Sequence, residues 1–317
     1  MTIQNETPYP YVAAILPDFD GRKAFVLLVK ATLRLTTHAL TPAQEPIRRA
    51  DVFFPSGALC YPCDLSLDHP GTDVIVHGTA HAPHGLPHAT FTASITVADI
   101  GSRIRVTGPR FFRRTRTGFV VTEPDRVGSV ALLHENAFGG ARCSENPIGK
   151  GSFAPGEPPD GQPLPLLEDA DAPAVNSPGD QPPPPAFGAI APHWTPRSAY
   201  AGTYDDAWRR TRAPLAPWDL DRRFFCAAPP RLCTARPLVG GEPIELHALS
   251  PYGPLFSRVP RLPLRILVDG ASHRPQLDRL VLEPDADRCI LTYRLALPAQ
   301  PRRTRIVEKR LLPKNAA

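Results

Sequence analysis

The sequence predicts a mainly β protein made of two β-sandwich-like halves, with a long Pro/Gly-rich irregular segment and a short helix between them. Three observations support this class. Apolar and polar residues alternate in the first third of the chain, as they do in strands. The 41 prolines among 317 residues are concentrated in the middle of the chain. Strand-like alternation then returns in the last third.

Residues 1–135 are predicted to form the N-terminal β-rich half. Alternation in "AFVLLVKATLRL" places Val29 and Ala31 on one face of a strand. Lys30 and Thr32 lie on the opposite face. The stretch "ATFTASITVADIGSRIRVTG" predicts a hairpin, with two alternating runs joined by a turn that contains glycine. A further strand is expected at "SVALLHE".

Residues 136–225 are predicted to form a central Gly/Pro-rich loop region. Between residues 154 and 197 there are 13 prolines in 44 positions, a density that neither a helix nor a central strand tolerates. The segment "GTYDDAWRRTR" predicts a short helix near residues 204–212. Thr203 and Asp206 have capping-box spacing, and arginines follow in the last turn, where the helix dipole favours them.

Residues 226–317 are predicted to form the C-terminal β-rich half. Strands are expected at "EPIELHAL" and "LPLRILVDG". The stretch "DRLVLEPDADRCILTYRLAL" predicts a hairpin in which Cys289, Leu291 and Tyr293 line one face. The three regions are expected to make one integrated unit.

The composition excludes several classes of protein. A net charge of +5 and a pI of about 9.0 favour anionic partners. Because the sequence contains no known nucleic-acid-binding motif, no nucleic-acid partner is expected. No apolar run reaches the ~18 residues of a membrane span, and the N-terminus lacks the basic region of a signal peptide. The six cysteines are therefore expected to be free thiols in a cytoplasmic protein.

The stretch "HENAFGGARCSENPIGKG" is rich in glycine and resembles a phosphate-binding loop, because Lys150 follows Gly149. That motif also needs a glycine where Ser144 stands and a serine or threonine where Gly151 stands. The spacing around Ser152 does not fit a nucleophile elbow either. We interpret the glycines as positions that need positive φ or close backbone approach, in a compact loop packed against "GTYDDAW".

Four histidines in "HGTAHAPHGLPH" suggest a metal site at first sight. On one strand, His77 and His81 would lie roughly 13 Å apart, too far to share a zinc ion. His84 and His88 lie in or after a turn, where a partner from elsewhere could reach them. Structural or solvated roles are favoured, so neither a metal nor any other cofactor is expected.

The pair Cys60 and Cys63 in "CYPC" has the spacing of half a zinc knuckle and also suits a redox turn. Because no second CxxC exists, two ordinary thiols are favoured.

Acidic residues gather in the central region and leave an enzymatic alternative open. A general acid and base could be drawn from them, for example Glu168 with Asp205. The cluster comprises Glu135, Glu145, Glu168, Asp169, Asp205, Asp206 and Asp219. Capping and ordinary loop roles are the stronger interpretation, so no catalytic residue is predicted.

The stretch from residue 194 to 225 combines aromatic residues with arginines. The aromatic members are Trp194, Tyr200, Tyr204, Trp208 and Trp218. Such residues dominate binding hot spots, and they also pin irregular backbone to a small core through guanidinium–ring contacts. Both interpretations remain open.

Several motifs occur in an order that resembles one bacterial family. They are "HPGTDVIVHGTAHAP", "FGG", "ENPIGKG", "LPLLED", "W-x-P-R", "AGTYDDAW", "DLDRRFFCAAP" and "GGEPIEL", and the resemblance runs from about residue 8 to residue 300. The family is that of type VI secretion accessory or adaptor proteins, a domain-of-unknown-function family linked to effectors and to VgrG and PAAR spike proteins. Departures include His69 in place of a lysine before "PGTD", and Ser152 between the glycine and phenylalanine of "NPIGKG-F".

The resemblance implies an adaptor or chaperone without catalytic turnover, which holds an effector encoded nearby and helps load it onto a VgrG or PAAR spike. The expected signature or partner-binding residues lie within residues 136–225, which we expect to form the recognition face. They are Phe138, Gly139, Gly140, Asn146, Pro147, Gly149, Lys150, Gly151, Trp194, Arg197, Gly202, Thr203, Tyr204, Asp205 and Trp208. The alternative is a hydrolase or metal-dependent enzyme that uses the central carboxylates or the histidines.

Overall fold

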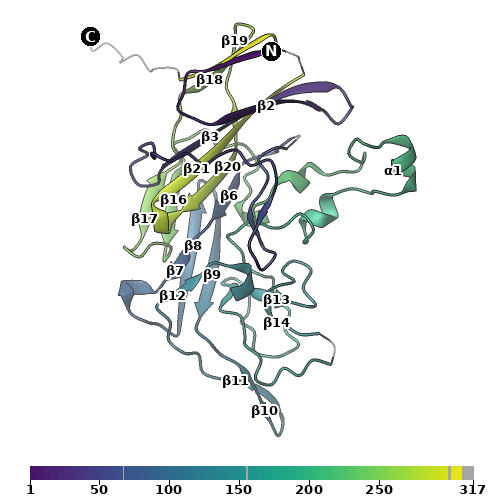
Figure 1. Ribbon diagram of the computed structural model, residues 1–317. Coiled ribbons are helices and arrows are strands. Elements are labelled where there is room, and N and C mark those ends of the chain that lie inside the picture. The colour runs from purple at the N-terminus through teal and green to yellow at the C-terminus, as the bar shows by residue number, and fades with distance from the viewer. Residues whose placement is uncertain (67, 155, 299–300, 309–317) are drawn as a thin grey trace.

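The computed structural model describes residues 1–66, 68–154, 156–298 and 301–308 (Figure 1). Strands account for 39% of the protein and helical turns for 9%, so the predicted mainly β class is confirmed. Within these residues the sheets follow one another along an elongated body, and one short α-helix stands off to one side.

The first five-stranded sheet contains the longest strands. Its order is β2 (Tyr11–Pro17), β3 (Lys23–Arg34), β21 (Arg288–Leu297), β20 (Gln276–Glu283) and β6 (Asp73–Val76). The predicted β20–β21 hairpin is confirmed; it turns through η6 (Pro284–Ala286). β6 joins the edge in parallel with β20, and the other pairs are antiparallel.

The second five-stranded sheet contains the other predicted hairpin. Its order is β15 (Leu167–Asp169), β9 (Ile100–Thr107), β8 (Thr90–Val97), β16 (Pro243–His247) and β17 (Leu255–Arg258). The hairpin turns at residues 98–99, where Ala98 has a φ of 53°, and not at a glycine. Gly101 lies within β9, paired with Thr96.

The remaining strands are shorter. A four-stranded sheet has the order β1 (Thr2–Asn5), β22 (Arg303–Glu308), β18 (Leu264–Val268) and β19 (Ala271–His273). Four strand pairs complete the set: β4 (Val52–Phe53) with β5 (Leu59–Tyr61), β7 (Thr79–His81) with β12 (Ser129–Ala131), β10 (Phe112–Thr115) with β11 (Gly118–Val121), and β13 (Phe138–Gly140) with β14 (Lys150–Ser152).

Strands from the two ends of the chain share both five-stranded sheets. β3 pairs with β21, and β8 pairs with β16. One hydrophobic cluster joins the sheets and includes Leu27, Ile95, Ile244, Leu282 and Leu291. Residues 1–135 and 226–317 therefore interleave and do not each build a sandwich of their own. Periodicity identifies a strand from local sequence but does not identify the strand that pairs with it.

β3 is buried on both faces. Lys30, on the face opposite Val29, is 2% exposed and forms an ion pair with Asp64. Its ammonium also donates to the carbonyl of Pro46 at 3.1 Å. Burial lowers the pKa of Lys30, and the neighbouring Asp64 carboxylate opposes that shift. The polar side of this strand is thus covered by the chain segment that precedes β6.

The predicted helix exists as α1 (Asp206–Thr211), but its cap differs from the prediction. Asp205 caps it, since its carboxylate accepts from the backbone N–H of Trp208 at 2.8 Å. The Thr203–Asp206 capping box is wrong, because the Thr203 hydroxyl donates to Asp219 at 2.7 Å. The remaining helical turns are the 3₁₀ turns η1 (Pro83–Gly85), η2 (His134–Asn136), η3 (Arg197–Tyr200), η4 (Arg222–Phe225), η5 (Pro230–Leu232) and η6.

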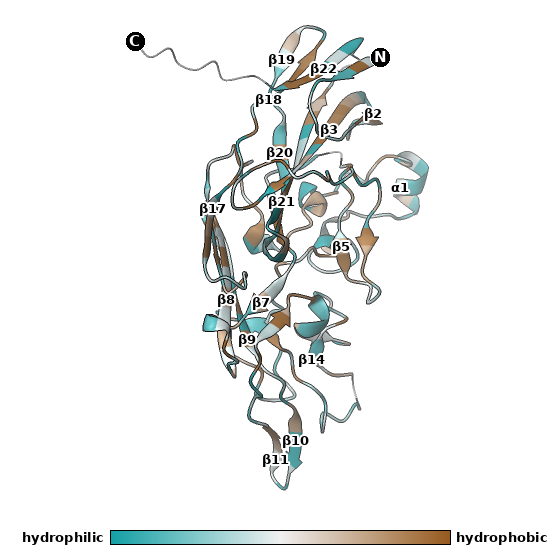
Figure 2. Ribbon diagram, turned by 60° about the vertical axis from the view of Figure 1, so that its left-hand side comes forward, coloured by the Kyte–Doolittle hydropathy of each residue, from teal (hydrophilic) through white to brown (hydrophobic). Residues whose placement is uncertain are grey.

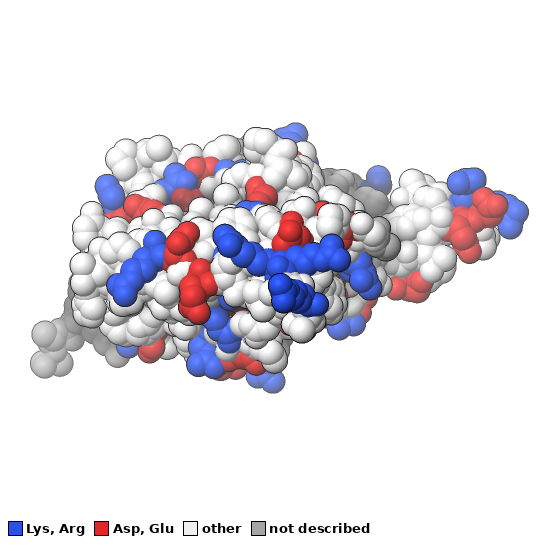
Figure 3. Space-filling view, turned by 90° about the horizontal axis from the view of Figure 1, so that it is seen from below, with Lys and Arg blue, Asp and Glu red and all other residues white. Residues whose placement is uncertain are grey.

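The two ends of the body differ in character. In Figures 1 and 2 the four-stranded sheet lies at one end and the β10–β11 hairpin at the other, while the hydrophilic α1 stands off the side. Figure 3 shows the β10–β11 end, where basic side chains gather. The hairpin contributes the exposed Arg113, Arg114 and Arg116.

Candidate functional site

The glycine loop (residues 136–152) is held together from inside. β13 and β14 pair in parallel, with Gly139 opposite Gly151. The amide of Asn146, which is 1% exposed, donates to the carbonyls of His134 at 2.8 Å and Phe138 at 2.9 Å. Its backbone carbonyl accepts from the N–H of Gly140 at 2.9 Å. Asn146 therefore ties the middle of the loop to its first strand and to the turn before it.

Close backbone approach explains two of the loop glycines. A Cβ at Gly139 would lie 2.2 Å from the carbonyl oxygen of Asn146, and a Cβ at Gly149 would lie 2.7 Å from that of Ala137. Gly151 has a φ of +98°, which side-chain-bearing residues rarely adopt. The predicted reason for these glycines is confirmed.

The glycine loop does not pack against the "GTYDDAW" segment as expected. α1 and β14 lie apart in both Figure 1 and Figure 2. The segment around Trp194 lies nearer, since the Trp194 ring meets His134, two residues before the loop, edge-on with centroids 5.2 Å apart. The backbone N–H of Thr195 also donates to the carbonyl of Ser144 at 3.1 Å.

The arm (residues 201–221) is a closed excursion that contains α1. At its base, the N–H of Asp221 donates to the carbonyl of Tyr200 at 3.0 Å. Gly202 has a φ of +79°, and a Cβ there would lie 3.0 Å from Asp219 Oδ1. Asp219 in turn accepts from the backbone N–H of Thr203 at 3.0 Å. These bonds fix where the chain leaves the body and returns to it.

Arginine anchors the arm to the body. Arg212 is buried, and its guanidinium donates to the carbonyls of Ala216 (2.8 Å) and Phe19, the latter in the β2–β3 connection. The same guanidinium lies 3.4 Å from the ring centre of Trp218, which is 74% exposed. Trp208 holds the arm internally, since its indole N–H donates to the carbonyl of Leu215 at 2.9 Å.

The predicted contact residues fall into three groups by exposure. The buried members are Phe138, Gly139, Gly140, Asn146, Gly151, Trp194 and Arg197. Gly149, Lys150, Gly202 and Trp208 are partly exposed. The exposed members are Pro147, Thr203, Tyr204 and Asp205. Three of the four exposed residues belong to the arm.

Six of the seven central carboxylates are engaged elsewhere, whereas Glu135 has a buried oxygen for which the described residues supply no hydrogen-bond partner. Glu168 is fully buried and pairs with Arg110 at 2.7 Å, while Asp205 caps α1, so the suggested acid–base pair does not share a contact. The other partners are Arg231 for Asp169, Arg209 for Asp206, Thr203 for Asp219 and Cys143 for Glu145.

The histidines of "HGTAHAPHGLPH" are not brought together. His77 is half-buried beside the Tyr61 ring, with centroids 4.8 Å apart, and loss of solvent around the imidazole lowers its pKa to about 4. His81 pairs with Asp285 at 2.9 Å. His84 lies in η1, whereas His88 bridges to Val127.

The six cysteines are free thiols, as predicted. Burial raises the pKa of both Cys60 and Cys63, which argues against a reactive thiolate at "CYPC".

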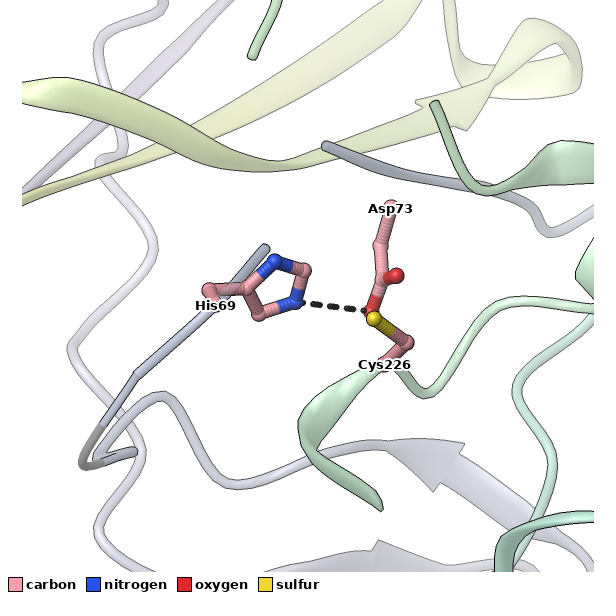
Figure 4. Close-up of side chains that lie close together, drawn as sticks. All are labelled: His69, Asp73 and Cys226. Carbon is pink, nitrogen blue, oxygen red and sulfur yellow. Dashed lines mark ion pairs between the residues drawn. The ribbon is translucent and has the colours of Figure 1, made fainter. Parts of the chain in front are cut away.

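A cavity of about 310 Å³ opens beside the base of the arm. Its lining includes Pro70, Arg197, Tyr200, Arg223, Cys226 and Cys233. Behind Cys226 lie His69 and Asp73, with the imidazole Nε2 3.3 Å from Asp73 Oδ2 (Figure 4). Ligand atoms of these three residues all lie within 4.8 Å of one another. Cys233 Sγ lies 3.4 Å from the other Asp73 oxygen.

The charges in this cluster are strongly coupled. Burial disfavours the charged form of His69, but the Asp73 carboxylate outweighs burial and raises the pKa of His69 to about 9. Asp73 has a lowered pKa, because His69, Arg279 and the N–H of Ala227 together overcome its own burial. At neutral pH the two form an imidazolium–carboxylate pair that is almost fully removed from water.

Sequence reasoning missed this cluster. His69 drew notice only as a departure from an expected lysine, Cys226 only as part of "DLDRRFFCAAP", and Cys233 only as one of the six expected free thiols. The available signals were two separate pairs, His-x₃-Asp and Cys-x₆-Cys, in segments far apart along the chain. Neither pair has the spacing of a common metal motif, so only the fold reveals that they meet.

The sequence matches the bacterial family described as "Uncharacterized protein conserved in bacteria (DUF2169)" over residues 20–294. Comparison with curated proteins and with solved structures finds no match. Within the described residues, no helix combines the length and the apolar character that crossing a bilayer would require.

Proposed function

This chain belongs to the bacterial DUF2169 family, and we propose that it is a cytoplasmic adaptor that binds a type VI secretion effector and helps load it onto a VgrG or PAAR spike. In this proposal it carries out no catalytic turnover. The order of the motifs in the sequence suggested type VI secretion, and the structure of the arm suggests how a partner would be held.

The observation that carries the proposal is the exposure of aromatic residues on an anchored arm. Tyr204 is 54% exposed and Trp218 is 74% exposed, although both belong to a segment fixed by bonds at its base and at Arg212. Large aromatic side chains held in place lose little conformational entropy on binding, and such residues dominate protein interfaces. Exposed aromatic side chains on a fixed backbone are therefore well suited to an adaptor surface.

The engaged carboxylates favour an adaptor over the hydrolase alternative. A general acid or base needs a titratable group that is free to reach a substrate. Here Glu168 is fully buried against Arg110, and Asp205 is committed to the cap of α1.

Co-expression with the effector encoded beside this chain tests the proposal, followed by affinity capture and size-exclusion chromatography. We expect the two proteins to co-elute and the effector to be insoluble or degraded when expressed alone. An effector from an unrelated locus is the control and should not co-elute. If the adjacent effector is soluble alone and elutes separately from this protein, the adaptor proposal is rejected.

A double variant then assigns the contact to the arm. Tyr204→Ala with Trp218→Ala removes exposed side chains and should weaken effector binding at least tenfold. The thermal midpoint should fall only slightly, because Arg212 loses its contact with the Trp218 ring but keeps its backbone bonds. Tyr252→Ala with Phe256→Ala is the matched control, because these aromatics are 97% and 67% exposed but lie outside the arm. Equal affinity for both variants would exclude the arm as the contact.

A further inference from the structure

We propose that His69, Asp73, Cys226 and Cys233 bind a zinc ion. The cluster joins two segments: the loop that leads into β6, and the segment that follows η4 at the foot of the arm (Figure 4). His69 is 2%, Asp73 0% and Cys226 9% exposed, and Cys233 is half-buried. The inference does not depend on the proposed adaptor function.

The spacing of the donor atoms fits a tetrahedral ion. With Zn–N and Zn–O bonds near 2.0–2.2 Å and Zn–S bonds near 2.3 Å, neighbouring ligand atoms are separated by about 3.3–3.8 Å. Here His69 Nε2 and Asp73 Oδ2 are 3.3 Å apart, and Cys233 Sγ and Asp73 Oδ1 are 3.4 Å apart. Cys226 Sγ lies within 4.8 Å of the His69 and Asp73 donors. His69 and Cys233 thus approach different oxygens of Asp73, and the donors that lie mutually within 4.8 Å are those of His69, Asp73 and Cys226. Cys233 would move toward these three to complete the tetrahedron.

The histidine is oriented as a metal ligand. Its Nδ1 lies 2.9 Å from the carbonyl of Gly71, which can only accept, so Nδ1 carries a proton. That bond directs Nε2 into the cluster, in the arrangement that typically orients a metal-binding histidine. Asp73 is oriented in the same way, since its Oδ2 accepts from the N–H of Ala227 at 2.6 Å.

The donor set and the surrounding charges select zinc. Two sulfurs and an imidazole favour zinc over magnesium or calcium, which prefer oxygen ligands. On binding, both thiols and His69 Nε2 release their protons to solvent. The ligands then carry three negative charges, of which the ion neutralises two. The guanidinium of Arg279, 3.9 Å from Asp73, offsets the third, and Arg197 lies at the adjoining cavity.

A cysteine nucleophile fits the geometry less well. In such a site one nitrogen of the histidine accepts the thiol proton while a carboxylate orients the other nitrogen. Here Nδ1 faces the Gly71 carbonyl, and Nε2 faces both the carboxylate and the thiol. The nitrogen that would act as a base is thus the one already paired with Asp73.

The bound ion would cross-link the two segments at the foot of the arm. They already touch through the backbone, where Thr234 donates to the carbonyl of Thr72 at 3.0 Å. Four protein ligands close the coordination sphere, so the proposed role is structural and not catalytic. Zinc should therefore raise the thermal midpoint of the protein.

Zinc content of the full chain, purified with zinc and then dialysed, tests the proposal. We expect about one zinc per chain by elemental analysis, and loss of that zinc in the C226S/C233S variant. The matched control is C60S/C63S, which removes the other cysteine pair and should keep the full zinc content. The proposal is overturned if the unaltered chain retains less than a tenth of an equivalent, or if C60S/C63S loses the zinc.

A second measurement on the unaltered chain covers the case in which C226S/C233S does not fold. Alkylation of individual cysteines is followed by mass spectrometry with zinc and with a chelator. Zinc should slow alkylation of Cys226 and Cys233 at least tenfold and leave the rates at Cys60 and Cys63 unchanged. Equal rates at Cys226 and Cys233 under the two conditions would contradict a zinc site there.

Discussion

The glycine loop and the arm contain most of the residues predicted to contact a partner, and the structure uses them in opposite ways. In the loop, Asn146 and the surrounding backbone bond to one another beneath the surface. In the arm, buried Arg212 ties the segment to the body while Tyr204 and Trp218 face solvent. A residue in a sequence motif can therefore serve the backbone conformation or contact another molecule. Its exposure to solvent distinguishes the two roles.

Replacement of a loop glycine should have the largest effect on stability. A Cβ at Gly139 would lie 2.2 Å from a backbone oxygen that cannot move independently, so G139A should lower the free energy of unfolding by roughly 3–4 kcal/mol. Denaturant titration measures this change. Gly128 has open space around its Cβ position, so G128A should stay within about 0.5 kcal/mol of the unaltered protein. Equal midpoints for both variants would show that the loop is not a rigid scaffold.

Acid should weaken the buried interior before it weakens the arm. Burial lowers the folded-state pKa of His77 to about 4, whereas the unfolded value is near 6.5. The unfolded chain therefore binds a proton first, and stability is lost as the pH falls through this window. His77 alone should account for a loss of about 2 kcal/mol between pH 7 and pH 5, while the raised pKa of His69 acts in the opposite direction. Denaturant titrations at several pH values measure it.

His77→Gln provides the control, because glutamine does not titrate. The variant should show a shallower loss of stability between pH 7 and pH 5 than the unaltered protein. Within the arm, hydrogen bonds from Thr203 lower the pKa of Asp219, so the tie at the base of the arm should persist through this range. An unchanged slope in the variant would rule out His77 as a source of the acid sensitivity.

Loss of the helix cap should have a smaller and local effect. Asp205→Ala removes the acceptor for the N–H of Trp208 and should destabilise α1 by about 1 kcal/mol. Faster amide exchange within residues 206–211 measures this change, while the global denaturant midpoint should stay the same. Asp206→Asn keeps the cap and loses only an exposed ion pair with Arg209, so its exchange should remain close to that of the unaltered protein.

The sequence predicted individual elements better than their assembly. Alternation located the hairpins that became β8–β9 and β20–β21, and the "GTYDDAW" composition located α1. Strand partners were not predictable in the same way, because the pairing of β3 with β21 joins residues from opposite ends of the chain.

The site was harder to predict for the same reason. Lys30 follows the strand period but is buried, since the covering segment with Asp64 supplies its charge partner. The His69–Asp73–Cys226 cluster forms only once distant segments meet. The role of the loop glycines was predictable from the sequence, because glycine is the residue type that tolerates a positive φ or a close backbone approach.

Hydrogen–deuterium exchange of the protein alone and bound to its adjacent effector tests the central distinction most directly. The account predicts slower exchange across the arm, residues 201–221, in the complex, with no change across residues 138–152, where several backbone N–H groups are already bonded within the loop. Protection of residues 138–152 with an unchanged arm would contradict it and would place the contact at the glycine loop.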